Sequence, residues 1–193
     1  MKQPLQTTLL LIFLTVLVCE IHGQELSCGF DQVHKAWLAQ KKNQLLLDRF
    51  EQAYFSAIES GYTKSSARYV LPVVVHIIHD NDAENISDQQ VIQGIQHLND
   101  AFANLDYYNP GTGVDVEVEF CLAKRDPSGG ATTGINRVQS PLTEFNYSIQ
   151  EDDFKNLSRW DPTRYINIWV AREICSASGC GVIGYAYFPT AHG

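Results

Sequence analysis

The sequence has 193 residues, of which 45% are hydrophobic and 19% charged, with a formal net charge of −8. This length and composition suit one ordinary domain with a real core plus a short extra segment, and they exclude a disordered tail. The negative charge argues against a nucleic-acid or anionic-membrane partner, because both attract clusters of Lys and Arg.

Residues 1–23 have the pattern of a secretory signal peptide. Lys2 supplies the positive start, and the apolar run at residues 9–18 is too short to span a bilayer as a stable helix. Gly23 is a small residue that suits a cleavage point. We therefore expect a secreted, extracellular protein with no membrane contact after signal removal. Three sequons are glycosylation candidates if the source is eukaryotic: Asn85, Asn146 and Asn156.

Residues 31–58 have the pattern of an amphipathic helix. Apolar side chains recur there at three-to-four spacing, with charged residues between them. The apolar positions are Val33, Trp37, Leu45, Leu46, Phe50, Ala53, Tyr54 and Ile58. The stretch "ESGYTKSSARY" then breaks the pattern with Gly61 and small polar residues, which predicts a linker open to proteolysis.

A strand and a well-marked helix follow this linker. The run "YVLPVVVHIIH" is nearly apolar and rich in β-branched residues, which predicts a strand at 69–79 covered on both faces. In "ISDQQVIQGIQHLNDAFANL", Ser87 caps a helix, Gln90 completes a capping box, and Ile86 is placed to pack on Val91. The expected core stripe of this helix is Val91, Ile95, Leu98, Phe102 and Leu105.

Three further strands are predicted. "VDVEVEFCL" alternates, which turns Val114, Val116, Val118 and Phe120 inward, and "YINIWVA" and "GVIGYAYF" follow a loop built on "DPSGG". The order of strand, helix and later strands predicts an α+β fold, α/β-like, with one mixed twisted sheet and one long helix packed on it. A Rossmann unit is excluded, because the turn "HDNDAEN" after the first strand has no glycine.

The residues that bear chemistry do not form a complete catalytic site. His76 and His79 lie three apart in a strand and point to opposite faces, so we interpret them as structural histidines. Three carboxylates share one face of a predicted strand and are candidate calcium ligands: Asp115, Glu117 and Glu119. They are too far apart along an extended strand for one compact site, so we favour a solvated strand face. The sequence contains no HExxH, no GxSxG and no phosphate loop.

Four cysteines remain once Cys19 leaves with the signal, in a compartment where disulfides persist. Cys28, in "SCGF", is either half of a disulfide or a thiolate held ready for a metal, since thiolates are strong zinc ligands. Cys175 and Cys180 flank the small tetrapeptide "SASG", which favours their pairing. Spacing does not fix connectivity, so a disulfide of Cys121 with either one is the alternative.

Six stretches together resemble one known family. In chain order they are "SCGF" before a charged helix, "LPVVVHIIH", "ISDQQVIQGIQHLNDAFAN", "VEVEFCLAKRDPSGGATTGINRV", "WDPTRYINIWV" and "GCGVIGYAYFP". Their order and spacing resemble the N-terminal portion of the pappalysin/ulilysin-type, cytophagalysin-like zinc metalloproteases of the metzincin clan. The similarity is weakest in the helical segment, where only the Cys-Gly pair and the helix match.

The resemblance implies three segments. Residues 1–23 would be the signal peptide, 24–68 a helical pro-segment and linker, and 69–193 the N-terminal, upper half of a metalloprotease catalytic domain. In that family a later helix carries three histidine zinc ligands and a glutamate general base. This sequence ends before such a motif. We therefore expect an inactive N-terminal fragment of a secreted zinc endopeptidase precursor, with zinc in the full-length parent only and a calcium requirement left open.

The resemblance also assigns roles to residues of this chain. It places no catalytic residue here, and it makes Cys28 a candidate zinc ligand that keeps the zymogen latent. An edge strand in these proteases binds the extended peptide or protein substrate, and that role falls on Gly181, Val182, Ile183, Gly184, Tyr185, Ala186 and Tyr187. Pro189 is expected to end the pairing. The alternative is a short secreted, non-catalytic binding or decoy module with the same half-fold.

Overall fold

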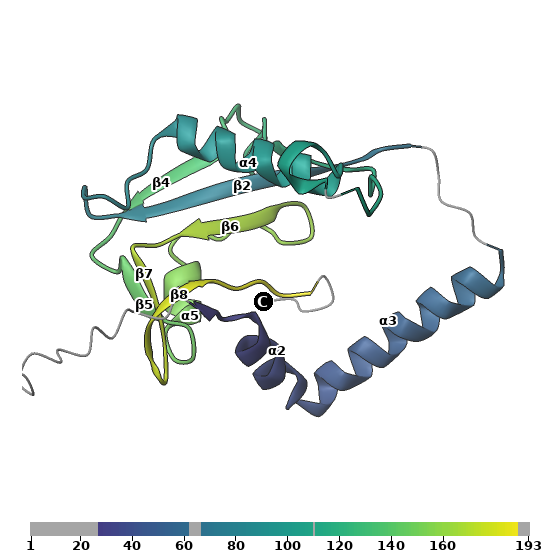
Figure 1. The fold of residues 1–193 in the computed structure, drawn as a ribbon. Helices are drawn as coiled ribbons and strands as arrows, with labels where there is room; N and C mark the ends of the chain where they lie inside the picture. The colour runs from purple at the N-terminus through teal and green to yellow at the C-terminus, as the bar shows by residue number, and fades with distance from the viewer. Residues whose placement is uncertain (1–26, 62–66, 110, 189–193) are drawn as a thin grey trace, which may run out of the picture.

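The computed structural model describes residues 27–61, 67–109 and 111–188, which form two four-stranded sheets with helices around them. The expected signal peptide and Pro189 lie outside these residues. No helix in the described ranges is long and apolar enough to cross a membrane. Figure 1 shows helix α4 lying across the first sheet, which contains β2, β4 and β6. The strands of the second sheet, β5, β7 and β8, lie lower in the same view, next to α5.

The first sheet is organised around β2 (Tyr69–His79), as the apolar run predicts. β3 (Val118–Leu122) pairs with the first half of β2, and β4 (Ile135–Gln139) with the second half. β6 (Ile166–Val170) pairs with residues 73–77 and so takes the other edge. All three pairings are parallel, and they satisfy the backbone of a strand whose last seven residues are buried.

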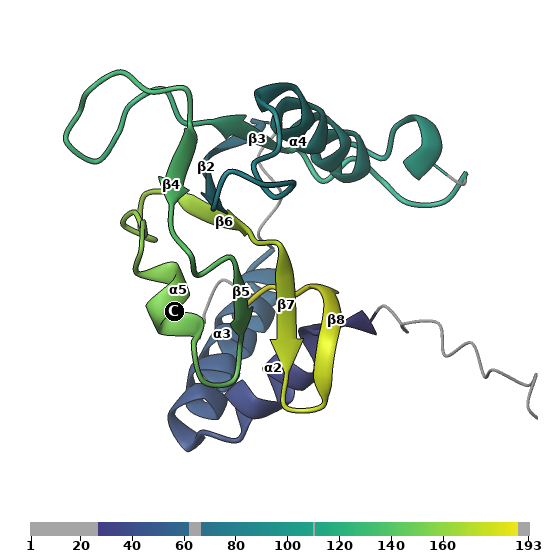
Figure 2. The same ribbon diagram turned by 90° about the vertical axis from the view of Figure 1, so that its left-hand side faces the viewer.

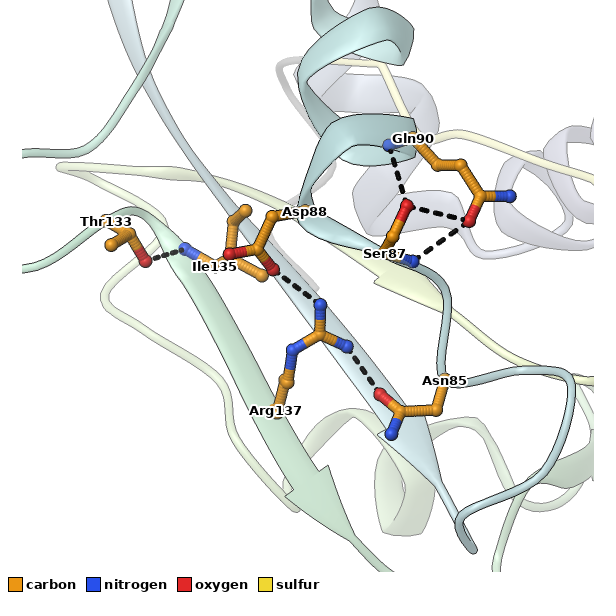
Figure 3. A network of polar contacts seen from close by, with 7 residues as sticks. All are labelled: Asn85, Ser87, Asp88, Gln90, Thr133, Ile135 and Arg137. Carbon is orange, nitrogen blue, oxygen red and sulfur yellow. Dashed lines mark hydrogen bonds and ion pairs between the residues drawn. The ribbon is translucent and has the colours of Figure 1, made fainter.

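The long helix α4 (Asp88–Phe102) begins with the predicted capping box. The Gln90 amide donates to the Ser87 hydroxyl, and the Gln90 side-chain oxygen accepts from the Ser87 amide (Figure 3). Arg137 of β4 donates to the side-chain oxygens of Asn85 and Asp88, and the Asp88 contact is 2.5 Å long. The start of the helix is therefore tied to the sheet on which it packs.

The core between α4 and the first sheet contains four of the five predicted helix positions. Buried β2 residues form its floor, and the helix contributes Val91, Ile95, Leu98 and Phe102. Ile86 joins the same cluster, as expected for a residue that packs on Val91. The prediction for Leu105 was wrong: the helix ends before it, and Leu105 is half exposed.

The outer edge of β3 is closed by a side chain. The Asn99 amide nitrogen donates to the Phe120 carbonyl oxygen at 2.9 Å, and the Phe120 amide donates to the Asn99 side-chain oxygen at 2.7 Å. Asn99 thus makes the two hydrogen bonds that a neighbouring strand would make.

The second sheet has the strand order β1-β8-β7-β5. It comprises β1 (Ser27–Cys28), β5 (Glu144–Asn146), β7 (Glu173–Ser176) and β8 (Gly179–Gly184). β5 follows β4, and β7 follows β6, so two strands of the first sheet lead directly into the second. Figure 2 shows β5, β7 and β8 side by side. The short helix α5 (Glu151–Lys155) contributes Phe154 to a core shared with Phe145 and Ile78.

The N-terminal helical segment is broken and mostly unburied. α2 (Phe30–Leu38) and α3 (Lys41–Glu59) replace the one helix expected over 31–58. α3 runs away from both sheets in Figure 1, and its predicted apolar stripe is largely exposed. The exposed stripe residues are Leu45, Leu46, Phe50, Tyr54 and Ile58.

Two further expectations about the sheet were wrong. The strand predicted from Val114 begins only at Val118, because Glu117 adopts a positive φ of 58° that interrupts an extended chain. Val114 and Val116 are consequently exposed. The expected single mixed sheet is two sheets, and the strands β4, β5 and β7 have no counterpart in the predicted elements. A short 3-10 helix, η1 (Asp106–Tyr108), was also not predicted.

Replacing Asn99 with Ala should lower the free energy of unfolding by about 2 kcal/mol, because it leaves the amide and carbonyl of the buried Phe120 without partners. Chemical denaturation measures this change. The matched control is Gln96→Ala on the same helix, whose exposed side chain bonds only Asp100 and which should cost less than about 0.5 kcal/mol. Equal effects of the two substitutions would contradict the prediction.

Candidate functional site

The hairpin of β7 and β8 carries the candidate substrate-binding strand. The two strands are antiparallel, and a disulfide joins Cys175 to Cys180 across the hairpin, with 3.9 Å between their Cα atoms. The favoured cysteine pairing is therefore the one in the structure, and Cys121 is free. Glycine at 179 and 181 is suited to this turn, since both positions have positive φ.

The outer edge of β8 is paired with the N-terminal segment that begins at Ser27. β1 runs parallel to β8, with Ser27 opposite Val182 and Cys28 opposite Gly184. The Gly29 amide then donates to the Gly184 carbonyl oxygen at 2.9 Å. The row of free backbone groups expected on this edge is thus occupied by the chain's own N-terminal segment along Val182 to Gly184.

Gly29 lets the N-terminal segment approach β8 this closely. A Cβ at this position would lie 2.8 Å from Cγ1 of Val182, closer than real Cβ contacts come. The backbone of Gly29 is in the ordinary helical region, so steric space alone, and not φ, requires a glycine here.

Helix α2 extends the contact beyond the two-residue strand. The Phe188 ring lies 5.4 Å from the Phe30 ring and 4.8 Å from the His34 ring, between centroids, with edge-to-face geometry in both pairs. The Tyr147 hydroxyl donates to the Gln32 side-chain oxygen at 2.7 Å. The N-terminal segment is therefore held at β8 by backbone pairing, by aromatic packing and by one polar contact.

Cys28 is exposed and is not in a disulfide. Its sulfur lies 3.7 Å from the Gly184 carbonyl oxygen, which is a weak thiol hydrogen bond. The structure thus places the Cys28 thiol at the end of β8, on the edge that β1 occupies.

The two histidines of β2 are structural in their contacts. His76 is fully buried, and its ring nitrogens face Asn167 at 2.9 Å and Asn136 at 3.2 Å. Burial lowers the pKa of His76, and the hydrogen bond with Asn167 opposes that shift in part. The ring also stacks on Trp169, with 5.1 Å between centroids. His79 is buried as well and accepts from the Asn81 amide at 3.3 Å.

The described residues do not fit a zinc ion. One group of three potential ligands lies close together in them, namely Glu173, Cys175 and Cys180. Because the two cysteines are joined in a disulfide, neither sulfur is a thiolate that a metal can bind. A zinc site would therefore need residues outside those that the structure describes.

The segment after β8 has a different environment from the one expected. The predicted strand at 181–188 ends at Gly184, and residues 185–188 continue without a strand partner among the described residues. Tyr185 and Tyr187 donate to Glu151 of α5, at 2.8 and 2.7 Å. Sequence reasoning missed Glu151, although its spacing of four from Lys155 was a signal for an ion pair on a helix.

An open pocket of about 530 Å³ lies beside β8. Its walls come from β8 itself at residues 181–183, and from Glu144, Arg172 and Ile174 on the neighbouring strands and their connection. The Arg172 guanidinium bonds the Glu144 carboxylate at 2.9 Å on this wall. Space for side chains of a bound peptide is therefore present on one flank of the strand.

The three sequons differ in accessibility. Asn146 donates to the Ser176 carbonyl oxygen at 3.0 Å, so its amide nitrogen is engaged within the fold. Asn85 is exposed but uses its side-chain oxygen to accept from Arg137, and Asn156 is exposed at the end of α5. Glycosylation of any of them stays a prediction.

Comparison with known proteins identifies a class. No protein-family model and no curated protein matches the sequence. A promirolysin mutant from Tannerella forsythia is 30% identical, over 85% of this chain and 53% of that one, with a TM-score of 0.60. Mature mirolysin from Tannerella forsythia in complex with a cleaved peptide is 37% identical over 55% of this chain and 43% of that one, with a TM-score of 0.49. Mirolysin in complex with compound 9 is 36% identical over 54% of this chain and 43% of that one, with a TM-score of 0.49.

The predicted resemblance to the pappalysin/ulilysin-type metzincin proteases is thereby confirmed, because mirolysin is a protease of that type. The argument rests on the promirolysin match, which exceeds a TM-score of 0.5 and includes most of this chain. The chain spans about half the length of the structures that it matches. It is therefore related to metalloproteases, in a zymogen-like form.

Replacing Gly29 with Ala should loosen β1 from β8, because the added methyl group meets Val182 at 2.8 Å while the backbone conformation suits alanine. Hydrogen exchange at the amide of position 29 should rise about tenfold or more. The matched control is Gly94→Ala in α4, where a Cβ meets nothing within 4 Å and exchange at β1 should not change. Unchanged exchange in the Gly29 variant would refute the close approach.

Proposed function

We propose that this chain is the N-terminal part of the precursor of a secreted zinc metalloendopeptidase, and that β8 is the strand on which its peptide substrate binds. The observation that carries the proposal is the pairing of Ser27–Cys28 with the outer edge of β8. A pro-segment that occupies the substrate's edge keeps a protease latent by simple exclusion.

The edge of β8 is suited to an extended peptide. The Gly184 carbonyl oxygen already accepts a backbone hydrogen bond there, so the edge has the geometry for strand addition. A Cβ at Gly184 would meet nothing within 4 Å, which leaves room for a second backbone. The proposed substrate contacts run from Gly181 to Tyr187, with the pocket beside residues 181–183 receiving side chains.

The proposed precursor has the segment boundaries predicted from the sequence: a signal at 1–23, a pro-segment and linker at 24–68, and catalytic-domain residues from 69 onward. Strand β1 and helix α2 belong to the pro-segment, whereas β8 belongs to the catalytic domain. Cleavage in the linker would leave β1 and α2 held by non-covalent contacts at β8, Phe188 and Tyr147. Their dissociation would expose the edge.

Zinc is the cofactor that the resemblance implies, and the described residues do not fit it. The proposal therefore places the remaining zinc ligands outside the described residues, with Cys28 as the one candidate ligand among them, and derives no catalytic step from the metal. What this chain supplies is the binding edge and its blocking segment. A calcium requirement stays open.

The role of Cys28 is tested in the complete precursor with Cys28→Ala. If this thiol keeps the enzyme latent, peptide hydrolysis before any processing should rise by at least about tenfold, because thiolate ligation of zinc is lost. The control is Cys121→Ala, which removes a free thiol that faces Glu119 on β3 and should leave latency as it is. A Cys28 variant as latent as the native precursor would remove this residue from the mechanism.

The role of the β8 edge is tested with two substitutions at one position in the processed enzyme. Because a strand residue directs its N–H and C=O to the same edge, the Gly184 amide faces the substrate side. Gly184→Pro deletes that donor and should lower kcat/KM for peptides by about tenfold or more, whereas Gly184→Ala keeps the donor in open space and should stay within about threefold. Similar kcat/KM values for both variants would show that substrate does not pair at this position.

A further inference from the structure

Three side chains converge on the carboxylate of Glu151. Its Oε1 accepts from the Tyr185 hydroxyl at 2.8 Å and from the Lys155 ammonium at 2.5 Å, and its Oε2 accepts from the Tyr187 hydroxyl at 2.7 Å. Both oxygens of the carboxylate are therefore used. The charged pair is largely removed from water, since the side chains of Glu151 and Lys155 are 20% and 11% exposed.

Lys155 also contacts the aromatic rings around Glu151. Its ammonium lies 4.6 Å from the ring centroid of Tyr187, 5.4 Å from that of Tyr185 and 5.3 Å from that of Trp169. The cation thus stabilises the carboxylate and packs on the same two aromatic rings that donate to it. Burial and the neighbouring carboxylate raise the pKa of both tyrosines well above the usual range, so both hydroxyls remain donors.

Stability of α5 does not explain this cluster. A buried ion pair commonly contributes no more than apolar residues of the same size, because both charges lose their hydration. The contacts also reach far along the chain, from Glu151 to residues 34 and 36 positions later. The cluster therefore fixes one distant segment of the chain, the one that contains Tyr185 and Tyr187.

That segment has no strand partner among the described residues. The β1–β8 and β7–β8 pairings end by Gly184, so residues 185–187 lie outside both ladders. Tyr185 and Tyr187 are separated by two positions and both face α5, whereas Ala186 between them is exposed. The side of the segment that carries Ala186 is therefore left open.

We propose that Glu151 is a positioning residue that holds residues 185–187 as the fixed continuation of the substrate-binding edge of β8. The inference rests on the proposed function and deepens it. A peptide that pairs with β8 and extends past Gly184 would run along the backbone edge of residues 185–187, because residues 184 and 186 of an extended chain direct their N–H and C=O groups to the same edge. Glu151 does not touch that peptide and acts through the two tyrosines.

Hydrogen exchange of the complete protein tests the positioning without any need for activity. Glu151→Gln should raise exchange at residues 185–188 about tenfold and leave the β2 amides unchanged, because only the anchor of this segment is lost. The matched control is Glu144→Gln, which removes the exposed ion pair with Arg172 beside β8 and touches neither tyrosine. The control should leave exchange at 185–188 as in the native protein.

A second variant also removes the positive charge of Lys155, which Glu151→Gln leaves without its buried partner. Combining it with Lys155→Met removes both buried charges at similar volume, so the fold should be retained. The same rise in exchange at 185–188 is expected. Native exchange rates at 185–188 in both variants would overturn the proposal, and so would a rise that is equally large in β2.

Peptide kinetics of the processed enzyme test the link to substrate. Glu151→Gln should raise KM about tenfold and leave kcat within about twofold, because positioning an edge supplies binding that ground state and transition state share. In a Tyr185→Phe/Tyr187→Phe background, the further change to Gln should have little effect on KM, since Glu151 acts through those hydroxyls. An undiminished effect in that background would overturn the proposed route. If the native enzyme hydrolyses no peptide, the proposed function fails, whereas the exchange comparison still decides the positioning.

Discussion

The structure depends on the burial of β2 between three parallel partners. A strand covered on both faces must pair its backbone groups on both edges, and β3, β4 and β6 together do so. That requirement fixes where β4 and β6 end. Because β5 and β7 follow them within a few residues, the second sheet is placed from the same point, and β8 is placed by its hairpin with β7.

The two sheets close their outer edges in physically different ways. On β3 the partner is the Asn99 side chain, which belongs to a capped helix packed on the same sheet. On β8 the partner is a two-residue strand that continues into α2 and α3, of which α3 makes little contact with the rest. An unpaired edge readily accepts another chain. Under the proposed function, the cover of the β3 edge is permanent, whereas the cover of the β8 edge separates when the enzyme is activated.

Backbone contacts position one part of the proposed binding edge, and side-chain contacts position the other. Along Val182 to Gly184 the edge is defined by ladder hydrogen bonds, which depend little on residue type. Beyond Gly184 the ladder stops, and the position of the chain depends on tyrosine hydroxyls that share one carboxylate. The match to promirolysin covers 85% of this chain, so it includes most of the residues on which this arrangement depends.

Local sequence determined the elements whose signals lie within a few residues of one another. The apolar run of β2, the capping box of α4 and the close spacing of Cys175 and Cys180 are of this kind, and the structure contains all three. Tertiary structure alone decided the rest. β4, β5 and β7 have three to five residues and, unlike the five-residue β6, lie outside any apolar or alternating run, so they were not predicted. The β1–β8 pairing and the Glu151 cluster join residues far apart in the chain, and no local pattern records such a contact, because it arises only when the packed sheets bring those residues together.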